Sequence, residues 1–312
     1  MTMAPDFADR LALPLIAAPM TGVSGPDLVA AACRNGVVGS FPTHNAATVA
    51  ELDGWLDQIR ATLAAHGPVT ASAPVAPNLV VHPTNTRLAA DLDRLVEHGV
   101  ELVITSVGSP APVLSRLHDA GCRVFADVAT LRQARKAIAA GVDGVVLLTA
   151  GAGGQTGSAN PFAFVRAVRD QFDGTIVLAG GIADGVSLFA AEVLGADLAY
   201  MGTRFIATSE SLASADYRNA LVTSTLDDVR LTDEIGGLPA SLLAQWLDSG
   251  ARRDRPVAAG DFRQDRLVAD PTVWSAGHSV STVRDIPDVD TLVHRIRAQY
   301  EQARAELRLA LD

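Results

Sequence analysis

A glycine-rich loop with the sequence LLTAGAGGQTGSANPF, from Leu147 to Phe162, has the composition of a ligand-binding loop. It follows an apolar run and precedes a proline-led helix, and its glycines allow a ligand to approach the backbone closely. Gln155 lies in the middle of this loop. A carboxamide donates and accepts hydrogen bonds but has no proton that titrates near neutral pH. The loop therefore predicts a ligand site whose central side chain cannot act as a general base.

Two further glycine turns occur in LAGGIADG and YMGTRF, after the last two apolar runs of strand length. Each turn leads into the N-terminus of a helix, where backbone N–H groups and the positive end of the helix favour an anion. In parallel-stranded barrels the loops after the last two strands commonly bind phosphate. We therefore predict phosphate binding by Gly180, Gly181, Gly202 and Thr203.

Polar side chains also follow the other apolar runs. A phosphate at one rim, with polar groups around a flat apolar opening, suits flavin mononucleotide (FMN) lying across the barrel mouth. The same residues would equally accept a sugar phosphate or another phosphorylated ligand. Asp127 could act as a base or as a hydrogen-bond anchor. Besides the loop with Gln155, these polar groups are PMTG at residues 19–22, Asn78, Thr105, Ser106 and Asp127.

A scaffold must bring these residues together at one end of many strands. Amphipathic stretches at residues 47–65, 87–98, 131–140 and 185–194 alternate with strands that are apolar on both faces. This alternation indicates a parallel sheet, and eight such units predict an α/β fold, a closed (β/α)8 TIM barrel. The predicted strands span residues 13–20, 37–42, 69–77, 101–108, 122–128, 144–150, 175–181 and 196–202.

The pattern changes after Tyr217, and we expect three regions. Residues 1–217 form the FMN-binding barrel, and residues 218–270 form an inserted lid or small substrate domain. Residues 271–312 form a return segment whose amphipathic helix, Asp288 to Leu311, packs on the barrel. A contact in a homodimer is the alternative role for this helix.

The composition excludes several classes of partner. A chain of 312 residues with a net charge of −10 argues against nucleic acid or an anionic membrane as the main partner, because both favour a basic face. The N-terminus lacks the features of a signal peptide and no apolar run has the length of a membrane span. We expect a cytoplasmic enzyme without a metal site, in which the unclustered Cys33 and Cys122 are reduced thiols.

Several sequence blocks resemble the nitronate monooxygenase family, also called the 2-nitropropane dioxygenase-like flavoproteins. They are LIAAPMTGVSGPDLVAAACRNGVVGSF, AGVDGVVLLTAGAGGQTG, IVLAGGIADGVSLFAAEVLGADLAYMGTRFIATSES and VWSAGHSV. The resemblance implies an FMN-dependent oxidoreductase on a TIM barrel with a small capping domain. We add Asp127 to the FMN contacts that it implies, which are Ala18, Met20, Thr21, Asn78, Gly151, Gly154, Gly180, Gly181, Gly202 and Thr203.

The sequence departs from the family at Gln155. The resemblance implies a loop of the form A-G-G-H-x-G, whose histidine removes a proton from the carbon beside the nitro group or polarises the nitronate. Two interpretations follow. Either Gln155 orients a nitronate that is already deprotonated, or the barrel acts on another substrate. Candidates for a replacement base are His44, His82 and His278.

We therefore predict an FMN-dependent oxidoreductase acting on a small carbon acid or a related substrate. One alternative is a desaturase or enoyl reductase of a CoA thioester, since relatives of the family include such enzymes. Another is an FMN- or phosphometabolite-binding protein without turnover. A cluster of arginines is suited to phosphate recognition and would fit the nucleotide end of an acyl-CoA, although we favour the interpretation of a solvated charged surface. They are Arg252, Arg253, Arg255, Arg263 and Arg266.

Overall fold

The computed structural model describes residues 5–250, 260, 262–264 and 272–311. Within these residues eight parallel strands close into a barrel in the order β1-β2-β3-β4-β5-β6-β8-β9, and β9 pairs with β1 to complete it. This closed barrel confirms the predicted (β/α)8 fold. Its strands are β1 (Leu15–Ala17), β2 (Val38–Pro42), β3 (Val75–Val80), β4 (Leu102–Ser106), β5 (Arg123–Val128), β6 (Gly144–Leu148), β8 (Thr175–Ala179) and β9 (Leu198–Met201).

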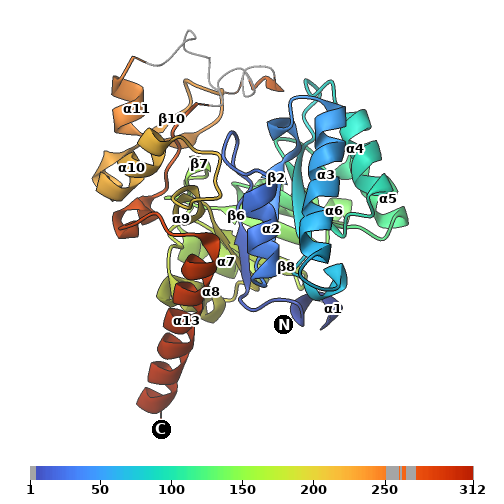
Figure 1. Cartoon of the computed structure of the whole chain (residues 1–312). Coiled ribbons are helices and arrows are strands. Elements are labelled where there is room, and N and C mark those ends of the chain that lie inside the picture. The colour runs from blue at the N-terminus through green and yellow to red at the C-terminus, as the bar shows by residue number, and fades with distance from the viewer. Residues whose placement is uncertain (1–4, 251–259, 261, 265–271, 312) are drawn as a thin grey trace.

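Helices cover the outside of the barrel (Figure 1). The side chains of Thr48, Thr130 and Asp184 each accept a backbone N–H in the first turn of α3, α6 and α8, which satisfies one of the free donors of a helix end. The helices up to the last barrel strand are α1 (Pro5–Ala8), α2 (Pro26–Arg34), α3 (Val49–Ala64), α4 (Leu88–Glu97), α5 (Ala111–Asp119), α6 (Leu131–Ala140), α7 (Pro161–Arg169) and α8 (Gly185–Leu194), with the short 3-10 helices η1 (Thr43–Asn45) and η2 (Val69–Ala71).

Glycine turns lead from several helices into the next strand, as the repeated sequences HGVEL, AGVDG and LGADL indicate. Gly99, Gly141 and Gly195 have φ angles of 63°, 98° and 111°, in the left-handed region. Only glycine adopts this region without a steric penalty, which is why helices often end at glycine.

The third barrel strand differs from its prediction. We predicted residues 69–77, but residues 69–71 form η2 and the strand β3 runs from Val75 to Val80. The exposed or half-buried positions of η2 contrast with the buried positions from Ala76 onward. The small and apolar residues of VTASAPVAP do not distinguish the two segments. As a result Asn78 lies inside the strand and not after it.

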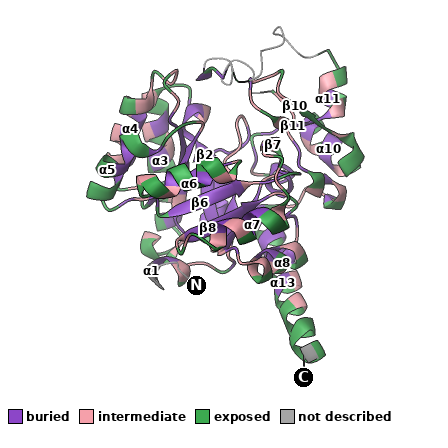
Figure 2. Ribbon diagram, turned by 180° about the vertical axis from the view of Figure 1, so that it is seen from behind, coloured by how far each residue is buried: buried purple, intermediate pink, exposed green. Residues whose placement is uncertain are grey.

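The barrel is filled by side chains that point inward from alternate strand positions. Ile16, Ala76, Phe125, Val177 and Leu198 belong to one buried cluster inside the barrel. A larger cluster lies between the strands and the surrounding helices, and Figure 2 shows the barrel strands as the buried centre of the molecule. Cys33 and Cys122 are buried and free.

A second, small sheet lies beyond the barrel mouth. Its order is β10-β11-β7, where β7 (Gly154–Gln155) comes from the glycine-rich loop. Figure 1 shows α10, α11 and β10 gathered near β7 at one end of the barrel. The elements after β9 are α9 (Thr203–Ile206), α10 (Ala215–Thr223), η3 (Leu226–Asp228), β10 (Val229–Thr232), β11 (Ala240–Leu243) and α11 (Ala244–Asp248).

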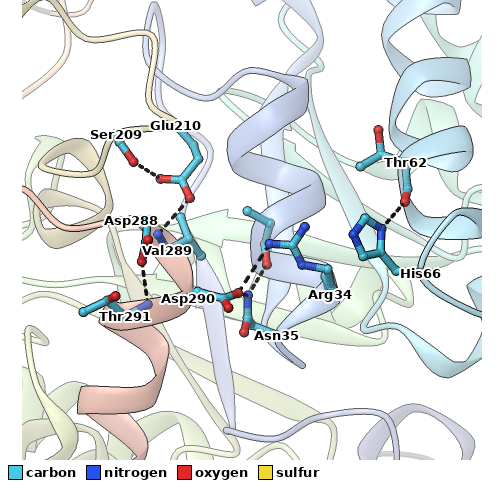
Figure 3. A network of polar contacts seen from close by, with 11 residues as sticks. Arg34, Asn35, Thr62, His66, Ser209, Glu210, Asp288, Val289, Asp290 and Thr291 are labelled. Atoms are coloured by element: carbon cyan, nitrogen blue, oxygen red, sulfur yellow. Dashed lines mark hydrogen bonds and ion pairs between the residues drawn. The ribbon is translucent and has the colours of Figure 1, made fainter.

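The C-terminal part returns to the barrel through η4 (His278–Thr282) and α13 (Val289–Leu311). Helix α13 packs against α8, where a Cβ at Gly185 would overlap the backbone of Tyr300. Its first turn is fastened by polar contacts (Figure 3), in which Glu210 accepts from the backbone N–H of Val289 at 2.9 Å and Asp290 accepts from Asn35 at 2.6 Å. Its far end extends beyond the body of the molecule (Figures 1 and 2).

In the described part of the chain, none of the helices combines the length and apolarity that crossing a membrane requires.

Candidate active site

A cavity of about 240 Å³ opens at the carboxyl ends of the barrel strands, beneath the small sheet. Every cofactor-contact residue predicted above borders it. These are Ala18, Met20, Thr21, Asn78, Asp127, Gly151, Gly154, Gly180, Gly181, Gly202 and Thr203. The closed barrel explains this convergence, because parallel strands present all their carboxyl ends at one mouth.

The glycine turns after β8 and β9 form one side of the cavity. Gly180 and Gly181 have φ angles of 125° and 78°, which a residue with a side chain adopts only under strain. A Cβ at Gly202 would lie 3.5 Å from Met20 Sδ and 3.6 Å from Ala18 Cβ, both of which border the cavity. The absence of a side chain at Gly202 therefore leaves backbone accessible to a ligand.

The phosphate site remains a prediction, and the two helix ends beside it differ in their capping. The N-terminus of α8 is capped by Asp184, whose side chain accepts from the Ser187 backbone at 2.8 Å. This cap already satisfies one of the free N–H groups at that helix end. The remaining donors are the backbone N–H groups of the glycine turns and of the start of α9, which has no side-chain cap.

The glycine-rich loop is held by the small sheet. Gln155 pairs with Ala240 of β11, and the backbone N–H of Thr156 donates to Pro239 at 3.0 Å. Gly151 and Gly154 have φ angles of 89° and 64°. The half-buried Gln155 borders the cavity, so the sheet fixes the backbone that presents its carboxamide.

Of the three candidate histidines, His44 borders the cavity. Its side chain is buried, and Nε2 lies 3.0 Å from the Thr21 hydroxyl. Desolvation, assisted by the positive charge of Arg87, lowers the pKa of His44 to about 4. The imidazole is therefore neutral near pH 7 and is a weak proton acceptor.

The structure places His82 and His278 outside the described cavity lining. His82 Nδ1 lies 2.8 Å from the Thr84 hydroxyl, and the ring meets Phe262 edge-on at 5.1 Å. His278 is exposed, and its backbone N–H donates to the Gly151 carbonyl at 2.9 Å. The backbone of His278 thus supports the glycine-rich loop, and its imidazole also lies beside the loop, because a Cβ at Gly151 would be 3.0 Å from His278 Nδ1.

Asp127 and Tyr200 lie on the barrel floor of the cavity. Oδ1 of Asp127 and the hydroxyl of Tyr200 are buried without a hydrogen-bond partner among the described protein groups. Desolvation raises the pKa of Asp127 to about 8. It also raises the pKa of Tyr200 well above its usual value, with a further contribution from the charge of Asp127.

Sequence reasoning missed the residues that complete the cavity. Tyr217 borders it, donates to the Ser275 carbonyl at 2.5 Å and stacks on Trp274 with ring centroids 5.4 Å apart. Val107 borders it with a φ angle of 52°, a left-handed conformation that costs a β-branched residue about 1–3 kcal/mol. No sequence signal marks either residue. The small sheet and its flanks contribute Ile235, Gly236, Leu238, Ala240 and Leu242.

The fold and the cavity define a class of protein. It is a TIM barrel with a ligand cavity at the carboxyl ends of its strands and glycine turns after the last two of them, where such barrels bind phosphate groups. The chain belongs to the nitronate monooxygenase family, whose profile matches residues 8–298.

Individual relatives agree with this assignment. The chain is 31% identical over 310 residues to a nitronate monooxygenase of Paraburkholderia phytofirmans, covering 86% of this chain and 81% of the relative. It is 28% identical over 262 residues to the (3aS,4S,5R,7aS)-5-hydroxy-7a-methyl-1-oxo-octahydro-1H-indene-4-carboxyl-CoA dehydrogenase of Mycobacterium tuberculosis, covering 80% and 71%. The alignments span from 60% to 81% of the length of three curated relatives.

A solved structure extends the agreement to three dimensions. The nitroalkane oxidase from Streptomyces ansochromogenes superposes with a TM-score of 0.81 at 26% identity, covering 97% of this chain and 99% of that one. The matches confirm the resemblance deduced from the sequence blocks. The protein is a flavin-dependent oxidoreductase of the nitronate monooxygenase family.

Proposed function

We propose that the protein uses FMN to oxidise a small carbon acid that reaches the cavity already deprotonated, with a nitronate as the model substrate. The observation that carries this proposal is the chemistry of the cavity lining. Glycine turns border one side, and two of the polar side chains that border the cavity, Gln155 and His44, are poor proton acceptors. Gln155 does not titrate, and the lowered pKa of His44 makes it a weak base.

The residues present fit FMN. Backbone N–H groups at Gly180, Gly181 and Gly202 would hold the phosphate, and the missing side chain at Gly202 leaves the space that it needs. Asn78, whose Oδ1 accepts from the Ser106 hydroxyl at 3.0 Å, keeps its amide N–H groups available to a ligand. When bound, the flavin supplies the electron acceptor, and the protein supplies placement and electrostatics.

We assign distinct roles to the polar side chains at the mouth. Gln155 would orient the substrate anion by donating a hydrogen bond from its carboxamide. The neutral His44, fixed by Thr21, would contribute a second polar contact without adding charge. The apolar groups Ile235, Leu238 and Leu242 would exclude water above the substrate.

We further propose that residues 218–270 act as the lid over a barrel formed by residues 1–217, with residues 271–312 returning to the barrel. The pairing of β7 with β11 supports this division of roles, because it joins the glycine-rich loop to the small sheet. A cytoplasmic location and a homodimer formed through α13 remain part of the proposal.

A CoA thioester is the second candidate substrate. The relative named as a carboxyl-CoA dehydrogenase favours it. Of the arginine cluster that would meet the nucleotide end, Arg252, Arg253, Arg255 and Arg266 lie outside the described residues, and Arg263 is exposed. If the cluster binds CoA, Ala substitution at Arg252 and Arg253 should raise KM for the thioester with less change in kcat.

An anaerobic reduction assay tests the proposal. Purified protein should be yellow with non-covalent FMN, and a preformed nitronate should bleach the flavin absorbance faster than the neutral nitroalkane, an acyl-CoA or NAD(P)H. Faster bleaching by an acyl-CoA would select the second candidate. A yellow protein that none of these donors reduces would support a binding protein without turnover. Colourless protein that takes up no FMN would overturn the cofactor assignment.

A further inference from the structure

The floor of the cavity contains two polar side chains that the substrate chemistry does not use, the half-buried Asp127 and the buried Tyr200. Asp127 lies on β5 and Tyr200 on β9, on different sides of the barrel, and both side chains border the cavity. Strands β4 and β6 lie on either side of β5, and they contribute Ser106 and Leu148 to the cavity lining. Asp127 and Tyr200 therefore offer polar atoms from below to whatever occupies the cavity.

Their hydrogen-bonding state indicates what they contact. Tyr200 is only 7% exposed, yet its hydroxyl has no described protein partner, and the same holds for Asp127 Oδ1. A buried polar group without a hydrogen bond costs about 1–3 kcal/mol. A barrel interior can be filled largely with apolar side chains, as Phe125, Val177 and Leu198 show. The two polar atoms without a protein partner at the cavity therefore point to a ligand.

The surrounding charges determine the form of the carboxyl group. The other titratable side chains among the described lining residues are His44, Tyr200 and Tyr217, and no lysine or arginine lines the described cavity. His44 is neutral near pH 7, and burial raises the pKa of both tyrosines. With no cation to stabilise a carboxylate, desolvation raises the pKa of Asp127 to about 8.

We propose that Asp127 and Tyr200 form a paired donor site for the bound flavin, in which Asp127 donates a hydrogen bond from its neutral carboxyl group and Tyr200 donates one from its hydroxyl. A protonated carboxyl is a donor, whereas a carboxylate only accepts. The pair would hold an acceptor edge of the cofactor from below, while the glycine turns hold its phosphate. This inference rests on the proposed use of FMN.

The pH dependence of FMN binding tests the proposal without any variant. If only the neutral carboxyl supports binding, the Kd should rise about tenfold between pH 7 and pH 9, because about nine-tenths of Asp127 ionises above its pKa of about 8. The FMN phosphate does not interfere, since a phosphate monoester has its second pKa at about 6. Quenching of FMN fluorescence on binding gives Kd at each pH.

Variants assign the effect to the two residues. Asp127→Asn keeps a donor but cannot titrate, so its Kd should stay constant over this pH range. Tyr200→Phe should weaken binding about fivefold at every pH, the value of about one hydrogen bond, while keeping the pH step. Tyr300→Phe is the matched control, because its hydroxyl donates to Glu192 between α8 and α13. It should bind FMN as wild type does.

The outcomes separate this inference from the proposed function. A wild-type Kd that is constant from pH 7 to pH 9 would overturn the neutral donor and leave FMN dependence intact. A pH step that persists in Asp127→Asn would also overturn it, by assigning the titration to another group. Protein that binds no FMN at any pH would instead remove the proposed cofactor.

Discussion

Gln155 shows how one residue changes the chemistry of a loop that otherwise resembles the loop of the family. The loop keeps its glycines and left-handed turns at Gly151 and Gly154, so its backbone can still approach a ligand. The family resemblance implies a histidine at this position, but a carboxamide takes up no proton near neutral pH. Loop geometry and proton chemistry are therefore separable here, and each can be tested.

Restoring the base should restore the proton step. Gln155→His should raise kcat/KM for a neutral nitroalkane by at least about tenfold, since general-base catalysis contributes about 10²–10⁴-fold in a well-fitted site. Gln155→Asn is the matched control, because it keeps an amide and adds no base. Steady-state oxidation of a neutral nitroalkane and its nitronate measures both variants. Rapid oxidation of the neutral substrate by wild type would show that another base acts.

His44 should make the free energy of unfolding depend on pH. Its pKa is about 4 in the fold and 6.5 in the unfolded chain, so the unfolded state binds the proton first as pH falls. Stability is therefore lost between about pH 6.5 and pH 4, by about 2–3 kcal/mol in total. Urea unfolding at pH 7 and pH 4.5 should show a smaller loss in His44→Asn than in wild type. His66→Asn, at an exposed histidine, should behave as wild type. An equal loss in His44→Asn and wild type would contradict the prediction.

At the scale of elements, the sequence predicts regular structure better than the contacts between distant segments. The barrel strands are apolar on both faces and alternate with helices, which identifies them directly. β3 was misplaced because the small residues before it resemble a strand. β7 has only two residues, Gly154 and Gln155, and exists because it pairs with Ala240 and Ser241 far along the chain. No local periodicity marks such a pairing.

In the candidate site too, residues in local turns could be predicted from the sequence, whereas residues brought together by the fold could not. Gly180 and Gly181 after β8 could be identified from the sequence as turn residues, because their left-handed conformations require glycine. Tyr200 did not, since an aromatic residue in a predicted strand is indistinguishable from a core residue. Only the closed barrel shows that its hydroxyl borders the cavity together with Asp127.

The turn after β9 allows a test of the proposed phosphate site. Gly202→Ala should leave the fold intact, because the added Cβ would meet Met20 and Ala18 at ordinary contact distances. The methyl group would nevertheless occupy the space proposed for the phosphate, so FMN should bind at least about tenfold more weakly, a loss of about 1.4 kcal/mol. Gly54→Ala on α3 has no neighbour within 4 Å and is the control. Equal FMN affinity in both variants would show that the phosphate does not bind beside Gly202.

At the scale of the molecule, the C-terminal return segment joins the two sides of the cavity. The backbone N–H of Gly277 donates to the Thr203 hydroxyl at 2.9 Å, beside the turn proposed to hold the phosphate. The next backbone N–H, that of His278, donates to Gly151 in the glycine-rich loop at 2.9 Å. A segment distant in sequence thus sets the spacing of the elements proposed to hold the cofactor and the substrate.

Asp285 fastens this return segment to the barrel, and its removal should affect both stability and cofactor binding. It accepts from Arg204 of α9 at 2.5 Å, and Arg204 is only 4% exposed. Arg295 of α13 binds the same carboxylate at 2.8 Å from a side chain that is 45% exposed. The two partners of one carboxylate therefore differ in burial, which provides a matched pair of variants.

Asp285→Ala should lower the free energy of unfolding by about 1–3 kcal/mol, because it leaves the buried guanidinium of Arg204 with fewer partners. We expect a loss in the lower part of this range, because the Asp285 side chain is 42% exposed and water screens its interaction with Arg204. Arg295→Ala should cost no more than about 1 kcal/mol. Because Arg204 directly follows Thr203, loosening it should also weaken FMN binding in Asp285→Ala but not in Arg295→Ala. Urea unfolding and FMN titration of both variants measure the two effects. Equal losses of stability in the two variants would show that burial of Arg204 does not govern this contact. Unchanged FMN affinity in Asp285→Ala would show that the return segment does not influence the turn proposed to hold the phosphate.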